Sequence, residues 1–295
     1  MMTLKTLAGA RRFEEVRTSY REAEPAAVAE TADLLRELGR YRLATDLYRH
    51  LLALGESSDL HYGLGESFGK MYRYGDALAH LERAFALAPA RTAGSAYYAY
   101  ILERGGRLAE AEHYYRRALA ESPTDPWVLS HYAHYLHKCG DAEQAAQTYQ
   151  QVLARYPAYT WAVKRYALLM LERGEPLAAA ALMAQSTVGG NPFARLNYLE
   201  YLLLVGEEEA YRSFRAGIDA TRLSTPCQVI LELFDYAREV LLVGASDPER
   251  LTAWKARVAN LDETIHRDFD DLEARIAHRG GNLDEWRSLV DALVK

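Results

Sequence analysis

The sequence predicts an all-α fold, an α-solenoid in which about six helical hairpins stack into a right-handed superhelix with a helical cap at the C-terminal end. Three observations predict it: small residues that recur about every 34 positions, large residues at helical spacing beside them, and glycine or proline where each helix should end. Self-similarity at such a period is typical of repeat arrays.

The repeat is defined by two small residues, one in each helix of a hairpin. The second-helix alanines recur at intervals of 33, 34, 34 and 34 residues: Ala44, Ala77, Ala111, Ala145 and Ala179. A small residue also stands twelve positions before each of them: Ala32, Gly65, Ala99, Ala133 and Ala167. Large side chains follow four positions after the alanines: Tyr48, Leu81, Tyr115, Tyr149 and Met183. Small residues on facing helices let two antiparallel helices approach closely, and the large ones fill the space beside them.

The expected helix ends carry the residues that stop helices. Glycine follows the first helix in four of the five units, at Gly39, Gly106, Gly140 and Gly174, and Tyr72 takes that place in the second unit. Glycine is favoured there because it adopts the left-handed conformation without strain. Proline closes three units, at Pro89, Pro123 and Pro157. A single hairpin cannot bury its own apolar face, so the units must stack on one another.

These residues and spacings resemble the tetratricopeptide repeat family. The similar units are 25–57, 58–91, 92–125, 126–159 and 160–192, followed by a degenerate unit at 193–224 whose first helix is out of register by about one residue. The whole array would span 25–224. The resemblance implies a protein–protein interaction scaffold or adaptor that holds a peptide or protein partner in a concave groove lined by the first helices.

In that family, positions 2, 5, 9 and 12 of each unit face the groove. Carried onto this sequence, the expected partner-binding residues are aromatic or polar: Tyr62, Glu66, Tyr100, Trp127, Ser130, His134, Trp161 and Lys164, with Arg165 adjacent. Rigid aromatic rings and arginine carry much of the binding energy at protein interfaces. Trp127 and Trp161 directly follow turns between units, so packing on the preceding unit explains them equally well. The lysine and asparagine residues of the family's clamp for chaperone tails are missing, which disfavours that ligand.

Both ends depart from the repeat. Residues 1–24 should form a capping helix, and residues 225–295 a C-terminal helical region with a long helix at 248–279 and a final helix at 283–294. Apolar residues spaced three and four apart run through the long helix, and we call them the apolar seam: Leu251, Trp254, Val258, Leu261, Ile265, Phe269, Leu272 and Ile276. Such spacing places them on one side of a single helix. The region either caps the last repeat or forms a homodimer through 248–294.

Two further patterns suggest chemistry but have simpler explanations. Residues 65–69, Gly-Glu-Ser-Phe-Gly, match the nucleophile motif of hydrolases, which requires a strand-to-helix turn; here it falls inside a predicted helix. His131, His134 and His137 follow one another at i, i+3 and i+6, and all three cannot converge on one metal ion. We therefore expect no catalytic residues, metal or cofactor, and no enzyme activity.

Composition narrows the remaining choices. The net charge is -6, the pI is about 5.9, and no basic block occurs, which argues against nucleic-acid binding. Two distant cysteines favour a reducing compartment, the N-terminus lacks a signal-peptide pattern, and no apolar stretch could cross a bilayer, so we expect a cytoplasmic protein without membrane insertion. Abundant arginine and alanine beside six lysines suggest a bacterial gene. The alternative function is a regulatory sensor whose array binds a signal peptide or small ligand and thereby controls a partner protein.

Overall fold

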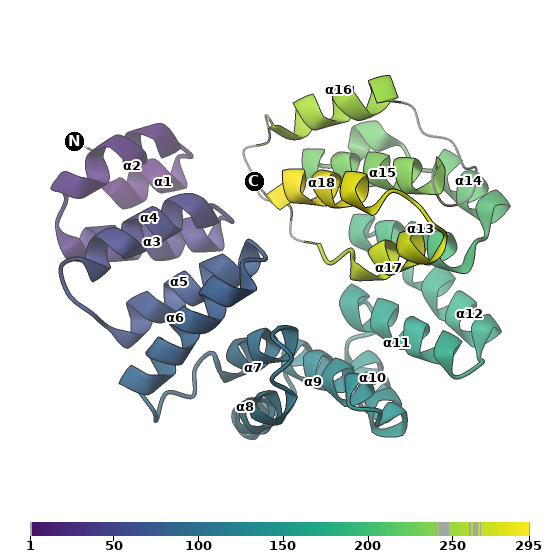
Figure 1. Cartoon of the computed structure of the whole chain (residues 1–295), viewed down its shortest axis with the longest axis horizontal. Helices are drawn as coiled ribbons and strands as arrows, with labels where there is room; N and C mark the ends of the chain where they lie inside the picture. The colour runs from purple at the N-terminus through teal and green to yellow at the C-terminus, as the bar shows by residue number, and fades with distance from the viewer. Residues whose placement is uncertain are drawn as a thin grey trace. The chain divides into compact units, whose positions relative to one another are not determined.

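The computed structural model describes residues 2–239, 241, 248–259, 261, 265 and 267–294. Within them it contains eighteen α-helices and no strand (Figure 1). The chain divides into two compact units, an N-terminal unit of residues 1–123 and a C-terminal unit of residues 124–295. The division follows the third repeat, whereas the sequence suggested boundaries after residues 24 and 224. None of the described helices combines the length and the apolar character that a bilayer span requires.

The N-terminal unit consists of helices that pack on their neighbours in chain order. They are α1 (Leu4–Gly9), α2 (Phe13–Ser19), α3 (Pro25–Glu37), α4 (Tyr41–Leu52), α5 (Ser58–Lys70), α6 (Tyr74–Leu87), α7 (Ser95–Arg104) and α8 (Leu108–Glu121). The hairpins are α3 with α4, α5 with α6 and α7 with α8, and α1 packs on α3. The single capping helix expected at 1–24 is instead two short helices, because the chain turns at Arg11, which has a φ of 59°.

The small residues of the repeat lie where the two helices of each hairpin meet. All nine alanines of the pattern are fully buried, and Gly65 is buried with them. A Cβ atom added to Gly65 would lie 2.6 Å from Cγ of Leu81 and 3.1 Å from the carbonyl oxygen of Ala77. The α5–α6 hairpin therefore closes to a distance that only glycine permits.

The turns inside the hairpins use the left-handed conformation that the sequence predicts. Gly39, Gly106, Gly140 and Gly174 have φ values between 74° and 88°. Tyr72 adopts the same conformation at a φ of 58°, although left-handed backbone is costly for a residue with a Cβ. The turn at Tyr72 keeps the hydrogen bond of the glycine turns, in which the next amide donates to the carbonyl five residues before it (Arg73 to Phe68, 2.9 Å).

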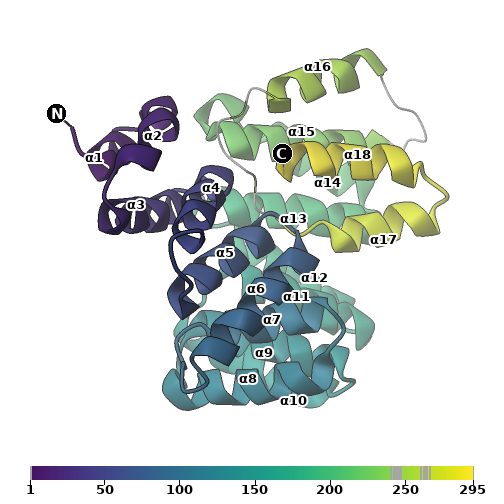
Figure 2. The ribbon, with the colours of Figure 1, turned by 60° about the vertical axis from the view of Figure 1, so that its left-hand side comes forward.

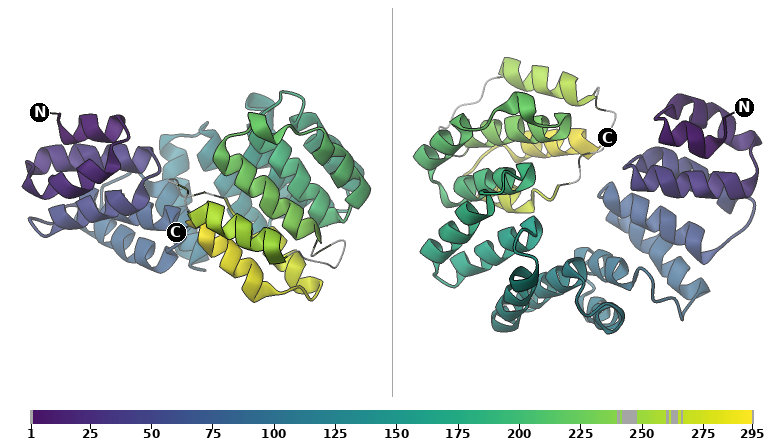
Figure 3. Two further views of the ribbon diagram at one scale, coloured as in Figure 1. Left: turned by 90° about the horizontal axis from the view of Figure 1, so that it is seen from above. Right: turned by 180° about the vertical axis from the view of Figure 1, so that it is seen from behind.

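The C-terminal unit continues the hairpins and then adds four helices. The hairpin helices are α9 (Pro126–Lys138), α10 (Ala142–Arg155), α11 (Thr160–Glu172), α12 (Pro176–Ser186), α13 (Pro192–Val205) and α14 (Glu208–Ala216). They are followed by α15 (Thr225–Arg238), α16 (Pro248–Ala259), α17 (Asp270–His278) and α18 (Leu283–Val294). Helix α13 contacts both α15 and α17, and α18 contacts both α16 and α17 (Figure 2). Figure 3 shows this group, in green and yellow, from two further sides.

The prediction of one long helix at 248–279 is wrong. Two helices occupy this stretch, α16 and α17, and residues 267–269 between them are not helical. The carboxylate of Asp268 accepts a hydrogen bond from the amide of Asp270 at 2.9 Å, and the first turn of α17 is acidic. Both features are typical of a helix start. This start was not predicted because the regular spacing of the apolar residues continues across it.

The apolar seam is nevertheless largely buried, although its residues lie on α16, on α17 and at non-helical positions between them. Trp254, Val258, Ile265, Phe269, Leu272 and Ile276 are at most 6% exposed and belong to one core with residues of α13, α15 and α18. Trp286 of α18 is 1% exposed, and its ring meets that of Phe269 edge-on at 6.1 Å. Burying one such side chain stabilises a protein by about 1.5–3 kcal/mol. These buried seam residues therefore pack within the chain's own core and do not form an exposed apolar surface for the suggested homodimer.

Candidate functional site

In the N-terminal unit, three of the predicted partner-binding residues lie on neighbouring first helices. Glu66 of α5 accepts a hydrogen bond from Nη1 of Arg36 of α3 at 2.5 Å, and both side chains are about one-fifth exposed. The hydroxyl of Tyr97, on α7, donates to the carbonyl oxygen of Glu66 at 3.2 Å. These contacts connect α3, α5 and α7 in order along the array.

Tyrosine rings and two cations complete this surface. The guanidinium of Arg91 lies 4.5 Å from the ring centre of Tyr62, and the rings of Tyr97 and Tyr100 are 5.9 Å apart. The ammonium of Lys70 lies 5.5 Å from the ring centre of Tyr97. We call the set Arg36, Tyr62, Glu66, Lys70, Tyr97 and Tyr100 the first-helix face. Sequence reasoning named Tyr62, Glu66 and Tyr100 and missed the others, of which Arg36 stands at the twelfth position of its unit.

The electrostatics of the first-helix face reflect its partial burial. Burial lowers the pKa of Lys70, and Arg36 adds to this, while Glu66 opposes both. Burial raises the pKa of Tyr62, and Glu66 raises it further, so its hydroxyl stays protonated at neutral pH. The face thus offers hydroxyl and ammonium donors beside one carboxylate, set among rings. Such a mixture is suited to holding a polypeptide by stacking and hydrogen bonds.

In the C-terminal unit, the predicted aromatic residues stack on a histidine. The His131 ring lies between Trp127 and Trp161, with ring centres 4.1 Å and 4.2 Å away, and the His134 ring meets Trp161 edge-on at 5.8 Å. Both tryptophans are half-buried, so the structure gives them a packing role without removing them from the surface. Ser130 is fully buried and its hydroxyl donates to the carbonyl oxygen of Pro126 at 2.5 Å, which excludes it as a groove residue.

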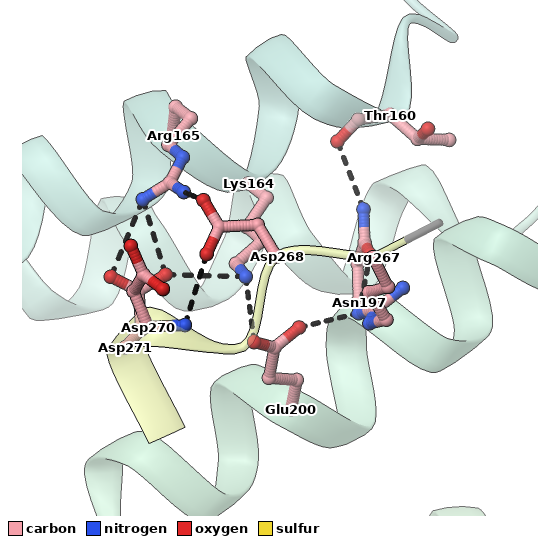
Figure 4. Close-up of polar contacts among 9 residues, drawn as sticks. All are labelled: Thr160, Lys164, Arg165, Asn197, Glu200, Arg267, Asp268, Asp270 and Asp271. Atoms are coloured by element: carbon pink, nitrogen blue, oxygen red, sulfur yellow. Dashed lines mark hydrogen bonds and ion pairs between the residues drawn. The ribbon is translucent and has the colours of Figure 1, made fainter. Parts of the chain in front are cut away.

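Lys164 and Arg165 of α11 are not exposed in a groove, as the sequence suggested, but buried beneath the chain's own C-terminal region (Figure 4). Arg165 donates to Asp268 at 2.8 Å and to Asp271 at 3.1 Å. Lys164 lies 3.2 Å from Asp271 and donates to Glu200 at 2.6 Å. These acidic residues pair with both cations, although the buried Nε of Arg165 has no hydrogen-bond partner among the described residues, and residues 268–271 cover this part of α11.

The same cluster extends to α13. Glu200 is fully buried and also accepts from Arg267, which donates to the side-chain oxygen of Asn197 at 2.8 Å. Burial alone would raise the pKa of Asp271, but Arg165 and then Lys164 outweigh it and hold that pKa below its usual range. We call Lys164, Arg165, Glu200, Arg267, Asp268 and Asp271 the ionic cluster. Buried charges are tolerated when they are paired and hydrogen-bonded in this way.

His134 lies near the ionic cluster. Burial lowers its pKa well below the ordinary value, and Arg165 and His131 lower it further, while Asp268 opposes them. The imidazole is therefore neutral at neutral pH. A neutral, half-buried ring against Trp161 fits packing better than capture of an anionic ligand.

The patterns that suggested chemistry have structural roles. Ser67, the serine of the hydrolase-like motif, is fully buried inside α5 and its hydroxyl donates to the carbonyl oxygen of Gly63 at 2.7 Å, so it cannot act as a nucleophile. His137 contacts Glu172 at 2.6 Å, whereas His131 packs between the tryptophans. Among the residues that the structure describes, no three histidine, cysteine or carboxylate side chains converge as metal ligands.

Comparisons with known proteins agree with the helical hairpins. Residues 62–126 match the model of the tetratricopeptide repeat family. A tetratricopeptide repeat protein from Parabacteroides merdae superposes with a TM-score of 0.55 at 13% identity, over 94% of this chain and 100% of its own. A thermophilic tetratricopeptide repeat protein from Thermus thermophilus superposes with a TM-score of 0.50 at 21% identity, over 61% of this chain and 100% of its own. At these identities the likeness establishes the fold alone. No curated protein sequence matches the chain significantly.

Proposed function

We propose that this chain, whose residues 62–126 match the tetratricopeptide repeat family and whose hairpins share the fold of such proteins, is an interaction scaffold. It would hold a peptide or protein segment against the first-helix face of its N-terminal unit. Of the partner-binding residues expected from the sequence, this surface keeps those of the second and third units and leaves out those of the fourth and fifth. Its partner is a polypeptide, since repeat arrays of this kind offer extended surfaces to other chains.

One contrast between the two units carries the proposal. In the C-terminal unit, the polar first-helix residues Lys164 and Arg165 are buried under residues 268–271. In the N-terminal unit, the contacts of the first-helix side chains run along the array, from Arg36 to Glu66 to Tyr97. Tyr62 and Tyr100 are half-buried there. Tyrosine rings lose little conformational entropy on binding and bury large areas, which makes them effective interface anchors.

Photo-crosslinking in the source cell tests where the partner lies. A photoreactive amino acid placed at Tyr62 or Tyr100 should label one partner chain, whereas the same group at Arg116 should not. Arg116 is 71% exposed on α8, the second helix of its hairpin, and serves as the matched control. Equal labelling from all three positions would show that the first-helix face is not the binding surface.

The identified partner then permits a quantitative test. Replacing Tyr62 and Tyr100 together by alanine should weaken its binding at least ~30-fold, the effect of losing about 2 kcal/mol at an interface hot spot. Isothermal titration calorimetry gives the affinity, and circular dichroism checks that the helices remain. Unchanged affinity in a folded variant would refute the proposal.

The alternative function, a regulatory sensor, is favoured by one observation. A cavity of about 440 Å³ lies between α14, α15 and α16 and includes Arg215, Asp235 and Trp254 in its lining, a volume within the range of small-molecule sites. Arg215 already donates to Asp235 at 3.0 Å, so a ligand would have to compete with this pair. A small ligand that changes the fluorescence of the wild type, but not of a Trp254→Phe variant, would support the sensor. If no such ligand is found, the scaffold remains the function that the structure supports better.

A further inference from the structure

A recess in the N-terminal unit indicates which kind of side chain a partner would place there. This recess of about 520 Å³ opens between the first and second repeats, where α3, the end of α4 and the start of α5 meet. Ala29 and Asp33 contribute from α3, at positions 5 and 9 of the first unit, and Asp59 contributes from position 2 of the second. These are groove positions of the repeat, so the recess lies on the surface where a partner is expected.

The walls of the recess are aliphatic. Leu51, Leu54 and Leu60 line it, and Leu54 is 62% exposed, which is unusual for a side chain of that size. Exposed apolar surface inside a recess is costly in water and favours an occupant that can cover it.

Two carboxylates stand among these aliphatic walls. The side chain of Asp33 is 59% exposed and that of Asp59 is 86% exposed, so both remain accessible to a ligand. Asp33 accepts a hydrogen bond from the Tyr48 hydroxyl at 2.6 Å, which fixes its position. The neighbouring cations, Arg36 and Arg91, do not line the recess.

The residues that line the recess carry a net negative charge, although each of the two carboxylates also contacts one arginine from outside the lining. Arg36 makes its short contact with Glu66 and lies 3.5 Å from Asp33, while Arg91 pairs with Asp59 from outside the lining. Within the described N-terminal unit, no lysine, arginine or histidine side chain lines the recess. The two arginines compensate part of the negative charge, so a cationic ligand would share Asp33 with Arg36 and Asp59 with Arg91.

We propose that this recess binds a lysine or arginine side chain from a basic segment of the partner polypeptide. The aliphatic stem of such a side chain would cover Leu54 and Leu60, and its charged end would lie between Asp33 and Asp59. Long cationic side chains characteristically bury their stems on apolar surface and keep the charged end in a polar, solvated place. The inference rests on the proposed scaffold function and names the chemistry of its ligand.

Short peptides of known sequence test the recess without knowledge of the partner. Four peptides share one alanine–glycine host sequence and differ at the central residue: lysine, arginine, norleucine or glutamate. The full-length chain carries labelled leucine methyl groups, and nuclear magnetic resonance follows the methyls of Leu51, Leu54 and Leu60 during titration. The lysine and arginine peptides should shift these methyls saturably, and the norleucine peptide, which has the stem without the charge, should bind more weakly.

Matched variants test whether peptide binding depends on the charge of Asp33 and Asp59 or only on the shape of the recess. Asp33→Asn and Asp59→Asn keep the size of each side chain, and the asparagine oxygen can still accept from Tyr48. Each should weaken the lysine peptide about two- to fivefold, the effect of one partly exposed ion pair, and leave the norleucine peptide unchanged. Asp76→Asn removes an exposed carboxylate that pairs with Arg73 on α6, outside the recess, and should have no effect. Rising salt should weaken only the cationic peptides.

The outcomes are decisive for the recess. Equal binding of norleucine and lysine peptides, absence of shifts at the three leucines, or insensitivity to both asparagine variants would each overturn the inference. Its failure differs from failure of the scaffold function, because crosslinks at Tyr62 and Tyr100 report partner binding whether or not the recess is used.

Discussion

Replacing Glu200 by alanine removes the central anion of the ionic cluster and leaves two cations behind. Glu200 is fully buried, accepts from Lys164 at 2.6 Å and also accepts from Arg267. Removing one partner of a buried ion pair costs about 3–5 kcal/mol, because the remaining charge stays buried without compensation.

The structure places the expected loss at the lower end of this range. After the substitution, Lys164 still lies 3.2 Å from Asp271, and Arg267 still donates to Asn197 at 2.8 Å. Each cation therefore keeps one partner. We expect the free energy of unfolding of the C-terminal unit to fall by about 3 kcal/mol.

Tryptophan fluorescence during urea unfolding measures this change in one unit alone. All four tryptophans of the chain, Trp127, Trp161, Trp254 and Trp286, lie in residues 124–295. A loss of about 3 kcal/mol should lower the urea midpoint by about 1 M or more. Far-UV circular dichroism, which reports both units, should show an early transition for only part of the helical signal.

Glu273→Ala is the matched control, since Glu273 pairs with Arg287 at 2.7 Å on the surface of the same unit. An exposed pair of this kind contributes less than about 1 kcal/mol. If Glu200→Ala lowered the midpoint no more than Glu273→Ala does, the ionic cluster would not stabilise the C-terminal unit and the reasoning would be refuted.

Two further predictions concern the N-terminal unit. Gly106→Ala places a side chain at a φ of 77° with no atom within 4 Å of the new Cβ, so backbone strain alone should destabilise the α7–α8 hairpin by about 1–2 kcal/mol. Hydrogen exchange should show weaker protection there, while Gly55→Ala, at ordinary φ, leaves it unchanged. Burial, then His61 and Arg49, lower the pKa of His80 against the opposing effect of Asp76. The unfolded chain therefore binds more protons below about pH 6.5, and stability should fall between pH 7 and pH 5. Replacing His80 by glutamine should flatten that dependence in circular dichroism melts, whereas the same change at exposed His113 should not; an unchanged slope would contradict the assignment.

The repeat array was predictable from the sequence because each hairpin depends on residues close together in the chain. The alanine and glycine pairs, the large residues four positions later and the turn glycines all lie within one 34-residue unit, and the structure places them as that spacing predicts. Even Tyr72, the exception among the turn glycines, adopts the left-handed conformation of its unit.

The candidate site was less predictable because burial depends on residues far apart in the chain. Lys164 occupies a groove position of its repeat and Arg165 the position beside it, yet Asp268 and Asp271, more than 100 residues later, cover them. No spacing within a repeat carries that information. The break between α16 and α17 was missed for another reason: the apolar spacing continues through it, while the helix-start signal at Asp268 depends on one side chain.

The ionic cluster also imposes an order on the synthesis of this protein. Arg165 leaves the ribosome 103 residues before Asp268 and 106 residues before Asp271. At about 5–20 residues per second, this interval lasts roughly 5–20 s. During that time Arg165 of α11 lacks its carboxylate partners, whereas Lys164 gains Glu200 after 36 residues. Arg165 therefore remains hydrated and the end of the array stays open. The N-terminal unit is already complete by then, and the chain can begin to use one half of its structure before the other half closes.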